Sequence, residues 1–153
     1  MIHKVGEKEM DSIILVSGGF DPIHSGHIKL IKEASRYGNI VVLLNSDEWL
    51  KNKKGKAFLP FEEREVIMNA LKYVIDVIVC GEIDNTCIDG LKKVIKKYPN
   101  HKIKFANGGD RNSKSTPESV FCEDNGIETL WGIGGDNKSN SSSWILKKWE
   151  KNN

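Results

Sequence analysis

The segment that decides the fold is residues 13–27, which read IILVSGGFDPIHSGH. It begins with the apolar, β-branched run of residues 13–16, and an unbroken run of this kind predicts a strand that is buried on both faces. Gly18 and Gly19 follow, and residues without a Cβ let the backbone approach a ligand closely. His24 and His27 come next, at the start of a helical pattern. A protein core has no use for two imidazoles there, whereas a phosphate site could use both.

The same change from strand to helix recurs along the chain. Apolar runs bounded by Gly, Asn, Asp or Pro alternate with amphipathic helical patterns. This alternation predicts an α/β fold, namely a single-domain, Rossmann-like, doubly wound parallel five-stranded sheet flanked by helices. In such a sheet, ligands bind beyond the carboxyl ends of the strands, where the strand order reverses. The expected strands are residues 13–16, 40–44, 74–79, 103–106 and 127–131, and the expected helices are residues 27–37, 61–71, 84–97, 116–125 and 142–149.

Length and charge limit the classes of function. A chain of 153 residues is one ordinary domain, so we expect a single unit over residues 1–153, with residues 1–10 as an N-terminal extension. The formal net charge is only +2, which argues against a nucleic-acid partner held by bulk charge. The polar start lacks the apolar stretch of a signal peptide, and no run is long enough to span a membrane. We therefore expect a cytoplasmic protein with no membrane partner.

The cysteines also favour a cytoplasmic protein. Cys80, Cys87 and Cys122 are odd in number, show no regular spacing and form no CxxC pair. This pattern argues against a disulfide framework. We expect free, buried or half-buried thiols in a reducing compartment.

His24 and His27 supply the chemistry that a phosphate site needs. A spacing of three at a helix start places both side chains on one face, and Gly26 keeps the surface between them open. The first helical turn adds unpaired backbone N–H groups and the positive end of the helix dipole. The segment matches neither a Walker A loop nor G-x-G-x-x-G, so the imidazoles must hold the anion. The alternative is a pair of solvated or capping histidines.

Six short motifs follow the expected elements in order. They are Gly19-Phe20-Asp21-Pro22-x-His24-x-Gly26-His27, Asn45-Ser46-Asp47, a lysine-rich stretch with Lys53 and Lys56, Glu63-Arg64, Asn107-Gly108-Gly109-Asp110, and Ser141-Ser142-Ser143. Together they resemble the H-x-G-H signature and the accompanying motifs of the nucleotidylyltransferase superfamily, which includes cytidylyltransferases and adenylyltransferases. The resemblance extends over nearly the whole chain.

The resemblance implies one type of reaction. A phosphorylated small molecule attacks the α-phosphorus of a nucleoside triphosphate in line, pyrophosphate leaves, no covalent enzyme intermediate forms, and Mg²⁺ assists. Such a reaction needs positive charge and hydrogen-bond donors around the triphosphate, but no protein nucleophile. The short single-domain plan resembles the cytidylyltransferases and favours CTP slightly over ATP, with a polyol, alcohol or sugar phosphate as the acceptor. The resemblance also implies a homodimer.

The resemblance assigns roles to single residues. The expected catalytic residues are His24, His27, Lys53 and Arg64, and Asp47 and Lys138 are expected to bind the acceptor substrate. No residue is assigned to a metal, because Mg²⁺ is expected to arrive with the triphosphate. The expected nucleotide contacts are Gly18, Gly19, Phe20, Asp21, Gly26, Lys56, Gly108, Asp110, Arg111, Ser141, Ser142 and Ser143.

Plain structural roles compete with several of these assignments. Asp21 suits a turn or a cap, and Arg64 suits a salt bridge. Residues 51–56 suit a solvated basic loop, and residues 141–143 suit a helix N-cap.

Two positions depart from the glycerol-3-phosphate cytidylyltransferase branch. Arg111 stands where that branch has an aromatic residue after the acid, and Lys138 is an imperfect substitute for its arginine before the last helix. These departures concern the substrates and leave the reaction type untouched. The competing functions are adenylyl transfer to a sugar 1-phosphate, a nucleotide sensor without turnover, and a synthetase-like RNA partner. The last of these is disfavoured by the lack of a strong basic face.

Overall fold

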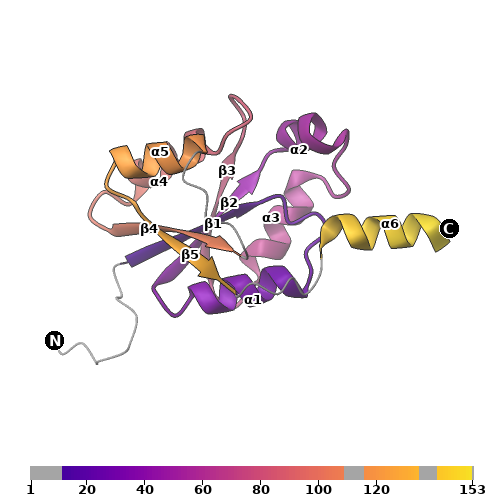
Figure 1. The fold of residues 1–153 in the computed structure, drawn as a ribbon, viewed down its shortest axis with the longest axis horizontal. Helices are drawn as coiled ribbons and strands as arrows, with labels where there is room; N and C mark the ends of the chain where they lie inside the picture. Colours follow the sequence, from indigo (N-terminus) through magenta and orange to yellow (C-terminus); the bar gives the residue numbers. More distant parts are fainter. Residues whose placement is uncertain (1–11, 109–115, 135–140, 153) are drawn as a thin grey trace.

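The computed structural model describes residues 12–108, 116–134 and 141–152. Its strands pair in parallel in one five-stranded sheet of order β3-β2-β1-β4-β5 (Figure 1). The order reverses between β1 and β4, so the predicted fold class is confirmed and the expected binding edge lies where these two strands end. The strands are β1 (Ser12–Gly18), β2 (Asn39–Asn45), β3 (Val74–Cys80), β4 (Lys102–Gly108) and β5 (Glu128–Ile133).

Helices cover both faces of the sheet. Helices α1 and α3 pack on one face, while α4 and α5 pack on the other (Figure 1). Helix α6 projects away from the sheet (Figure 1). Within the described ranges, no helix is long and apolar enough to cross a lipid bilayer. The helices are α1 (Ser25–Ala34), α2 (Asp47–Lys54), α3 (Phe61–Asn69), α4 (Ile88–Lys97), α5 (Pro117–Asp124) and α6 (Ser142–Asn152).

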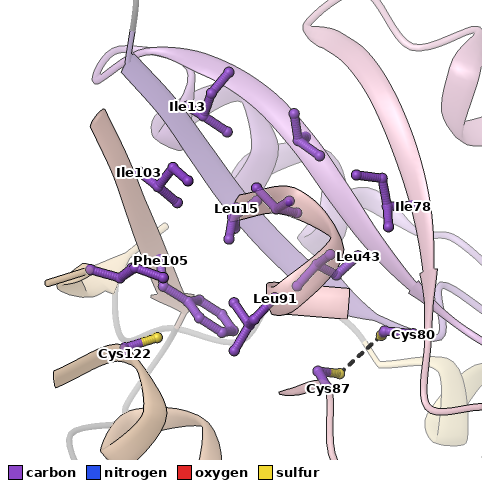
Figure 2. Packing of buried hydrophobic residues seen from close by; sticks show 13 residues of the cluster. Ile13, Leu15, Leu43, Ile78, Cys80, Cys87, Leu91, Ile103, Phe105 and Cys122 are labelled. Atoms are coloured by element: carbon purple, nitrogen blue, oxygen red, sulfur yellow. Dashed lines mark hydrogen bonds between the residues drawn. The ribbon is translucent and has the colours of Figure 1, made fainter. Parts of the chain in front are cut away.

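The central strand β1 is buried on both faces because its side chains alternate between two apolar clusters. Ile13 and Leu15 join the cluster beneath α4 and α5, which Figure 2 shows, and Ile14 and Val16 join the cluster beneath α1 and α3. All four side chains are at most 1% exposed. Burying one such side chain contributes roughly 1.5–3 kcal/mol. The unbroken apolar run is therefore what this position in the sheet requires.

Some helix boundaries differ from the prediction. Helix α1 begins at Ser25, not at residue 27, because His24 serves as its N-cap. Helix α4 begins at Ile88, not at residue 84, because Asp84 builds a turn ahead of it. The carboxylate of Asp84 accepts hydrogen bonds from the backbone N–H of Thr86 at 2.8 Å and from its hydroxyl at 2.6 Å. An Asp that satisfies nearby groups in this way competes with helix formation.

The largest difference is helix α2, which occupies most of the stretch that the sequence analysis treats as a basic loop. The hydroxyl of Ser46 caps the helix by accepting a hydrogen bond from the backbone N–H of Trp49 at 3.0 Å. Acidic residues fill its first turn and lysines fill its last turn, which suits the helix dipole. Gly55 ends the helix with a φ of 92°, a conformation that favours glycine. The expected loop over residues 51–56 is therefore wrong as far as Lys54.

Candidate active site

The turn between β1 and α1 is held tightly by its neighbours. A Cβ on Gly19 would lie 2.8 Å from Leu50 Cδ2, so only glycine lets α2 approach the turn this closely. Phe20 is buried with a φ of 50°. The buried carboxylate of Asp21 accepts hydrogen bonds from the backbone N–H groups of Phe58 at 2.6 Å and Leu59 at 2.7 Å. Asp21 therefore anchors the segment after α2 through long-range contacts, which neither the expected nucleotide contact nor the local turn or cap alternative describes, and both its oxygens are engaged within the protein.

The two histidines cap the start of α1 reciprocally. His24 Nδ1 accepts a hydrogen bond from the backbone N–H of Gly26 at 3.0 Å, and His27 Nδ1 accepts one from the backbone N–H of His24 at 3.2 Å. The rings stack with their centroids 3.7 Å apart. Because both Nδ1 atoms act as acceptors, the proton of each neutral ring lies on Nε2. The predicted capping role and the predicted shared face therefore occur together, and the pair presents two Nε2–H donors.

His27 stays neutral near neutral pH. Its pKa is lowered from 6.5 to about 3, first by burial and then by the Coulombic interactions of a protonated His27 with His24 and with Lys54. A side chain with such a pKa does not store a proton for transfer at pH 7. It can still donate a hydrogen bond from Nε2.

Arg64 lies inside the protein, not on its surface. Its side chain is fully buried, and its guanidinium donates to the backbone carbonyls of Gly19 at 3.0 Å and Asn45 at 2.7 Å. It also donates to the carbonyl of Leu59 at 2.9 Å and to the carboxylate of Asp47 at 2.7 Å. The salt bridge considered as the alternative for Arg64 is present, and its partner is Oδ1 of Asp47, the residue expected to bind the acceptor substrate. Arg64 ties together the ends of β1 and β2 and the start of α2.

The lysines of α2 face in different directions. Lys53 Nζ lies 5.7 Å from the centroid of the Trp49 ring, one helical turn away. Lys54 lies one turn after Leu50, on the face that packs against Gly19, and its charge reaches His27. The charge of Lys54 therefore acts on His27, whereas the expected Lys53 lies over the ring of Trp49. Lys56 is exposed and follows the helix.

The start of α6 reaches the same turn. The hydroxyl of Ser142 donates a hydrogen bond to the backbone carbonyl of Pro22 at 2.7 Å. The hydroxyl of Ser141 accepts a hydrogen bond from the backbone N–H of Trp144 at 3.0 Å, as an N-cap does. Ser143 is exposed. The serine cluster is therefore a helix cap located beside the β1–α1 turn.

The remaining expected contacts belong to the loops after β4 and β5. Gly108 is the last residue of β4 and pairs with Ile133 of β5. Because β4 runs beside β1, its end lies at the same edge of the sheet as Gly18. Asp110, Arg111 and Lys138 lie outside the described residues.

Among the residues that the structure describes, no three His, Cys, Asp or Glu side chains converge to hold an ion. The described part of the chain therefore offers no protein-only cage for Mg²⁺. This ion is commonly held by substrate phosphates together with few protein ligands.

Three residues near the site were not identified from the sequence. Trp49 packs against Gly81, where an added Cβ would lie 2.5 Å from Trp49 Cδ1. The carboxylate of Asp89 accepts hydrogen bonds from the backbone N–H groups of Gly81, Glu82 and Gly90, each at 2.9 Å. Lys54 is the third of these residues, because the sequence analysis assigned roles to Lys53 and Lys56 instead. Acidic residues at 47 and 48, lysines at 51, 53 and 54 and Gly55 are helix signals that could have identified α2 and the direction of Lys54.

Comparisons with known proteins agree with this geometry. One curated relative is FAD synthase from Pyrococcus horikoshii, which is 37% identical over 52% of this chain and 56% of its own length. Another is glycerol-3-phosphate cytidylyltransferase from Bacillus subtilis, which is 38% identical over 42% of this chain and 51% of its own length. The matched region thus spans about half the length of these relatives.

A solved structure supports the fold. The lipopolysaccharide core biosynthesis protein from Thermoplasma volcanium superposes with a TM-score of 0.63 at 23% identity, covering 86% of this chain and 100% of that one. The family model described as cytidylyltransferase-like matches residues 15–121, from the middle of β1 into α5. That match includes the glycine turn, both histidines and Arg64, and on this ground the chain belongs to the cytidylyltransferase-like family.

Proposed function

We propose that the protein transfers a nucleoside monophosphate from a nucleoside triphosphate to a phosphorylated small molecule. The observation that carries this proposal is the pair of stacked histidines at the start of α1, both with Nδ1 bonded to the backbone. An oxygen of the acceptor phosphate attacks the α-phosphorus, a new P–O bond forms, and the bond to the leaving pyrophosphate breaks. The chain needs to supply positioning and donors, and no residue has to become covalently attached.

The histidines act as hydrogen-bond donors in this proposal. The two Nε2–H groups donate to phosphate oxygens whose negative charge shifts as the bond to pyrophosphate breaks. The N-terminus of α1 adds backbone N–H groups and its dipole. Because His27 is neutral at pH 7, it contributes through this hydrogen bond and not as a proton donor. The triphosphate enters as its Mg²⁺ complex, and the ion neutralises part of the phosphate charge.

We assign the cationic role in α2 to Lys54 and not to Lys53. Lys54 follows Leu50 by one turn on the face that touches the glycine turn, and its positive charge acts on His27. Lys53 lies over the indole of Trp49, whose Nε1 donates to the carbonyl of Asn85 at 3.1 Å. That contact directs Lys53 toward the β3–α4 connection. An exposed ammonium beside two imidazole donors can meet a phosphate without moving the backbone.

The finer assignments rest on the relatives. CTP is favoured because a glycerol-3-phosphate cytidylyltransferase matches the chain, which makes a small phosphorylated alcohol or polyol the preferred acceptor class. Adenylyl transfer is the second candidate, because an FAD synthase matches with similar identity over a longer segment. A homodimer is part of the proposal, and sedimentation velocity over a range of protein concentrations tests it.

The experiment is a panel of the four nucleoside triphosphates with Mg²⁺, each against phosphorylated alcohols, polyols and sugars. Pyrophosphate release is the readout. We expect release that depends on one nucleotide and one class of acceptor. His27→Asn should lower kcat by about 10²-fold, because it removes one donor to the transition state. Nucleotide binding without acceptor-dependent release across the panel would favour the sensor alternative.

Lys54→Met and Lys53→Met form a matched pair for the assignment within α2. Both remove one charge from adjacent exposed positions of one helix. We expect Lys54→Met to lower kcat/KM at least tenfold and Lys53→Met to change it by less than about threefold. The reverse order, or equal losses, would refute the assignment of Lys54. Thermal unfolding of both variants shows whether α2 is intact.

A further inference from the structure

Cys80 and Cys87 form a pair of thiols that the proposed function does not use. Cys80 ends β3, Cys87 is the N-cap of α4, and their sulfur atoms lie 3.0 Å apart (Figure 2). Cys80 is fully buried and Cys87 is 7% exposed. Six residues, 81–86, separate them, so the sequence spacing gives no sign of the contact. The fold brings them together because the chain turns back from β3 into α4.

The side chain of Asn45 completes this cluster. Its Nδ2 lies 3.4 Å from Cys80 Sγ and 3.5 Å from Cys87 Sγ. A thiol is a weak donor and a weak acceptor, so the hydrogen bonds within this cluster are weak. If a bond between the sulfurs replaces the two S–H groups, both sulfurs can still accept from the amide.

We propose that Cys80 and Cys87 form a reversible disulfide that links the end of β3 to the start of α4. The sulfur atoms need to approach by only about 1 Å to reach the length of a disulfide bond. The linkage closes a short ring over residues 81–86. The carboxylate of Asp89 already holds the start of this connection through the backbone N–H groups of Gly81 and Glu82. Little of the connection therefore has to rearrange when the ring closes.

The reaction needs an oxidant, and a small-molecule disulfide of the glutathione type is sufficient. The thiolate of Cys87, the more exposed of the pair, attacks one sulfur of that disulfide, forms a mixed disulfide and releases one small thiolate. Cys80 then attacks the sulfur of Cys87, and the second small thiolate leaves. The two protein thiol protons end on the two small thiols. The protein sulfurs are oxidised and the reagent disulfide is reduced.

Cys122 provides an internal control. It is as buried as Cys80 and belongs to the same apolar cluster, yet Figure 2 shows it apart from the pair, beside Phe105. Burial raises the pKa of the Cys122 thiol to about 11, and the hydrogen-bond contact with Cys87, together with burial, raises the pKa of the Cys80 thiol. Thiols of this kind react slowly. The geometry therefore predicts slow oxidation that joins Cys80 to Cys87 and excludes Cys122.

The test uses the full chain under native conditions. The protein is reduced, freed of reductant and incubated with oxidised glutathione at pH 8, then denatured in iodoacetamide and digested with trypsin. Trypsin leaves both paired cysteines in one peptide, residues 73–92, and Cys122 in another, residues 115–138. We expect the first peptide without alkylation and two hydrogens lighter, and the second peptide alkylated. Dithiothreitol should restore two alkylated cysteines in the first peptide.

Two variants and one further sample complete the test. Cys122→Ser should leave the oxidised product unchanged, and Cys87→Ser should abolish it. A sample unfolded in urea before oxidation should give mixed pairings that include Cys122, which would show that the fold directs the native product. Full alkylation of residues 73–92 after native oxidation overturns the proposal, as does a stable glutathione adduct or a bond to Cys122. Because the readout is mass, this result is independent of the proposed catalytic function.

Discussion

His27 makes the stability of the fold depend on pH by an amount that follows from its pKa. Burial and the Coulombic interactions with His24 and Lys54 lower this pKa from 6.5 to about 3. Between the two values the unfolded chain binds a proton at His27 and the folded chain does not, so the free energy of unfolding falls as the pH drops below 6.5. Each pH unit inside this window is worth about 1.4 kcal/mol. Lowering the pH from 6.5 to 5 therefore removes about 2 kcal/mol through this side chain.

Urea unfolding of the wild type and of His27→Gln, at pH 7.5 and at pH 5, measures this effect. Glutamine is polar but does not titrate, so the carboxylates contribute equally to both proteins and cancel in the difference. We expect the wild type to lose about 2 kcal/mol more than the variant between the two pH values. A difference below about 0.5 kcal/mol would mean that folded His27 accepts a proton readily. That outcome would refute the assignment of His27 as a neutral donor.

Three further substitutions, the first with a matched control, test the contacts around the site by denaturant unfolding. Gly81→Ala should lower the free energy of unfolding by about 3 kcal/mol, because the φ of Gly81 is 80° and the new Cβ meets Trp49. Gly55→Ala is the control: Gly55 has a φ of 92° but no atom within 4 Å of the new Cβ, so the loss should be only about 1–2 kcal/mol. Equal losses would mean that the contact with Trp49 is unimportant. Arg64→Lys should cost about 3 kcal/mol, since an ammonium cannot satisfy the acceptors that the buried guanidinium serves, and a loss below about 1 kcal/mol would contradict that picture. Asp21→Asn should cost about 2 kcal/mol, because the amide turns a donor toward one of two backbone N–H groups, and an unchanged midpoint would argue against this anchor.

The sheet and the place of its binding edge were predictable because they depend on local patterns. Each of the apolar runs at residues 13–16 and 40–44 is long, continuous and closed by polar residues, and such a run fits only a strand covered on both sides. The parallel order then places the ends of β1 and β4 together. The two histidines were predictable as a pair, because their spacing of three at a helix start is itself local.

The contacts that organise the site were not predictable, because they join residues far apart in the sequence. Arg64 meets the carbonyl of Gly19 across 45 positions, and Asp21 meets the backbone N–H of Leu59 across 38. Asn45 meets Cys87 across 42 positions. Nothing in the local pattern distinguishes a buried arginine from a surface arginine. The directions of Lys53 and Lys54 were not predictable either, because they depend on the phase of a helix that was read as a loop.

The charged residues around the site are arranged to hold its backbone, and this bears on how the histidines act. Asp21 and Arg64 are both buried. Asp21 accepts hydrogen bonds from the backbone of the segment after α2, and Arg64 donates to the backbone of the β1–α1 turn and of the end of β2. A buried charge is tolerated only when such partners satisfy it, so each one fixes the segments that it joins. The start of α1 and the start of α2 are thereby fixed relative to each other before any ligand arrives. In the proposed transfer, donors held in place in this way need no reorganisation when charge moves onto the leaving phosphates, which is the condition under which hydrogen bonds from neutral imidazoles accelerate a transfer.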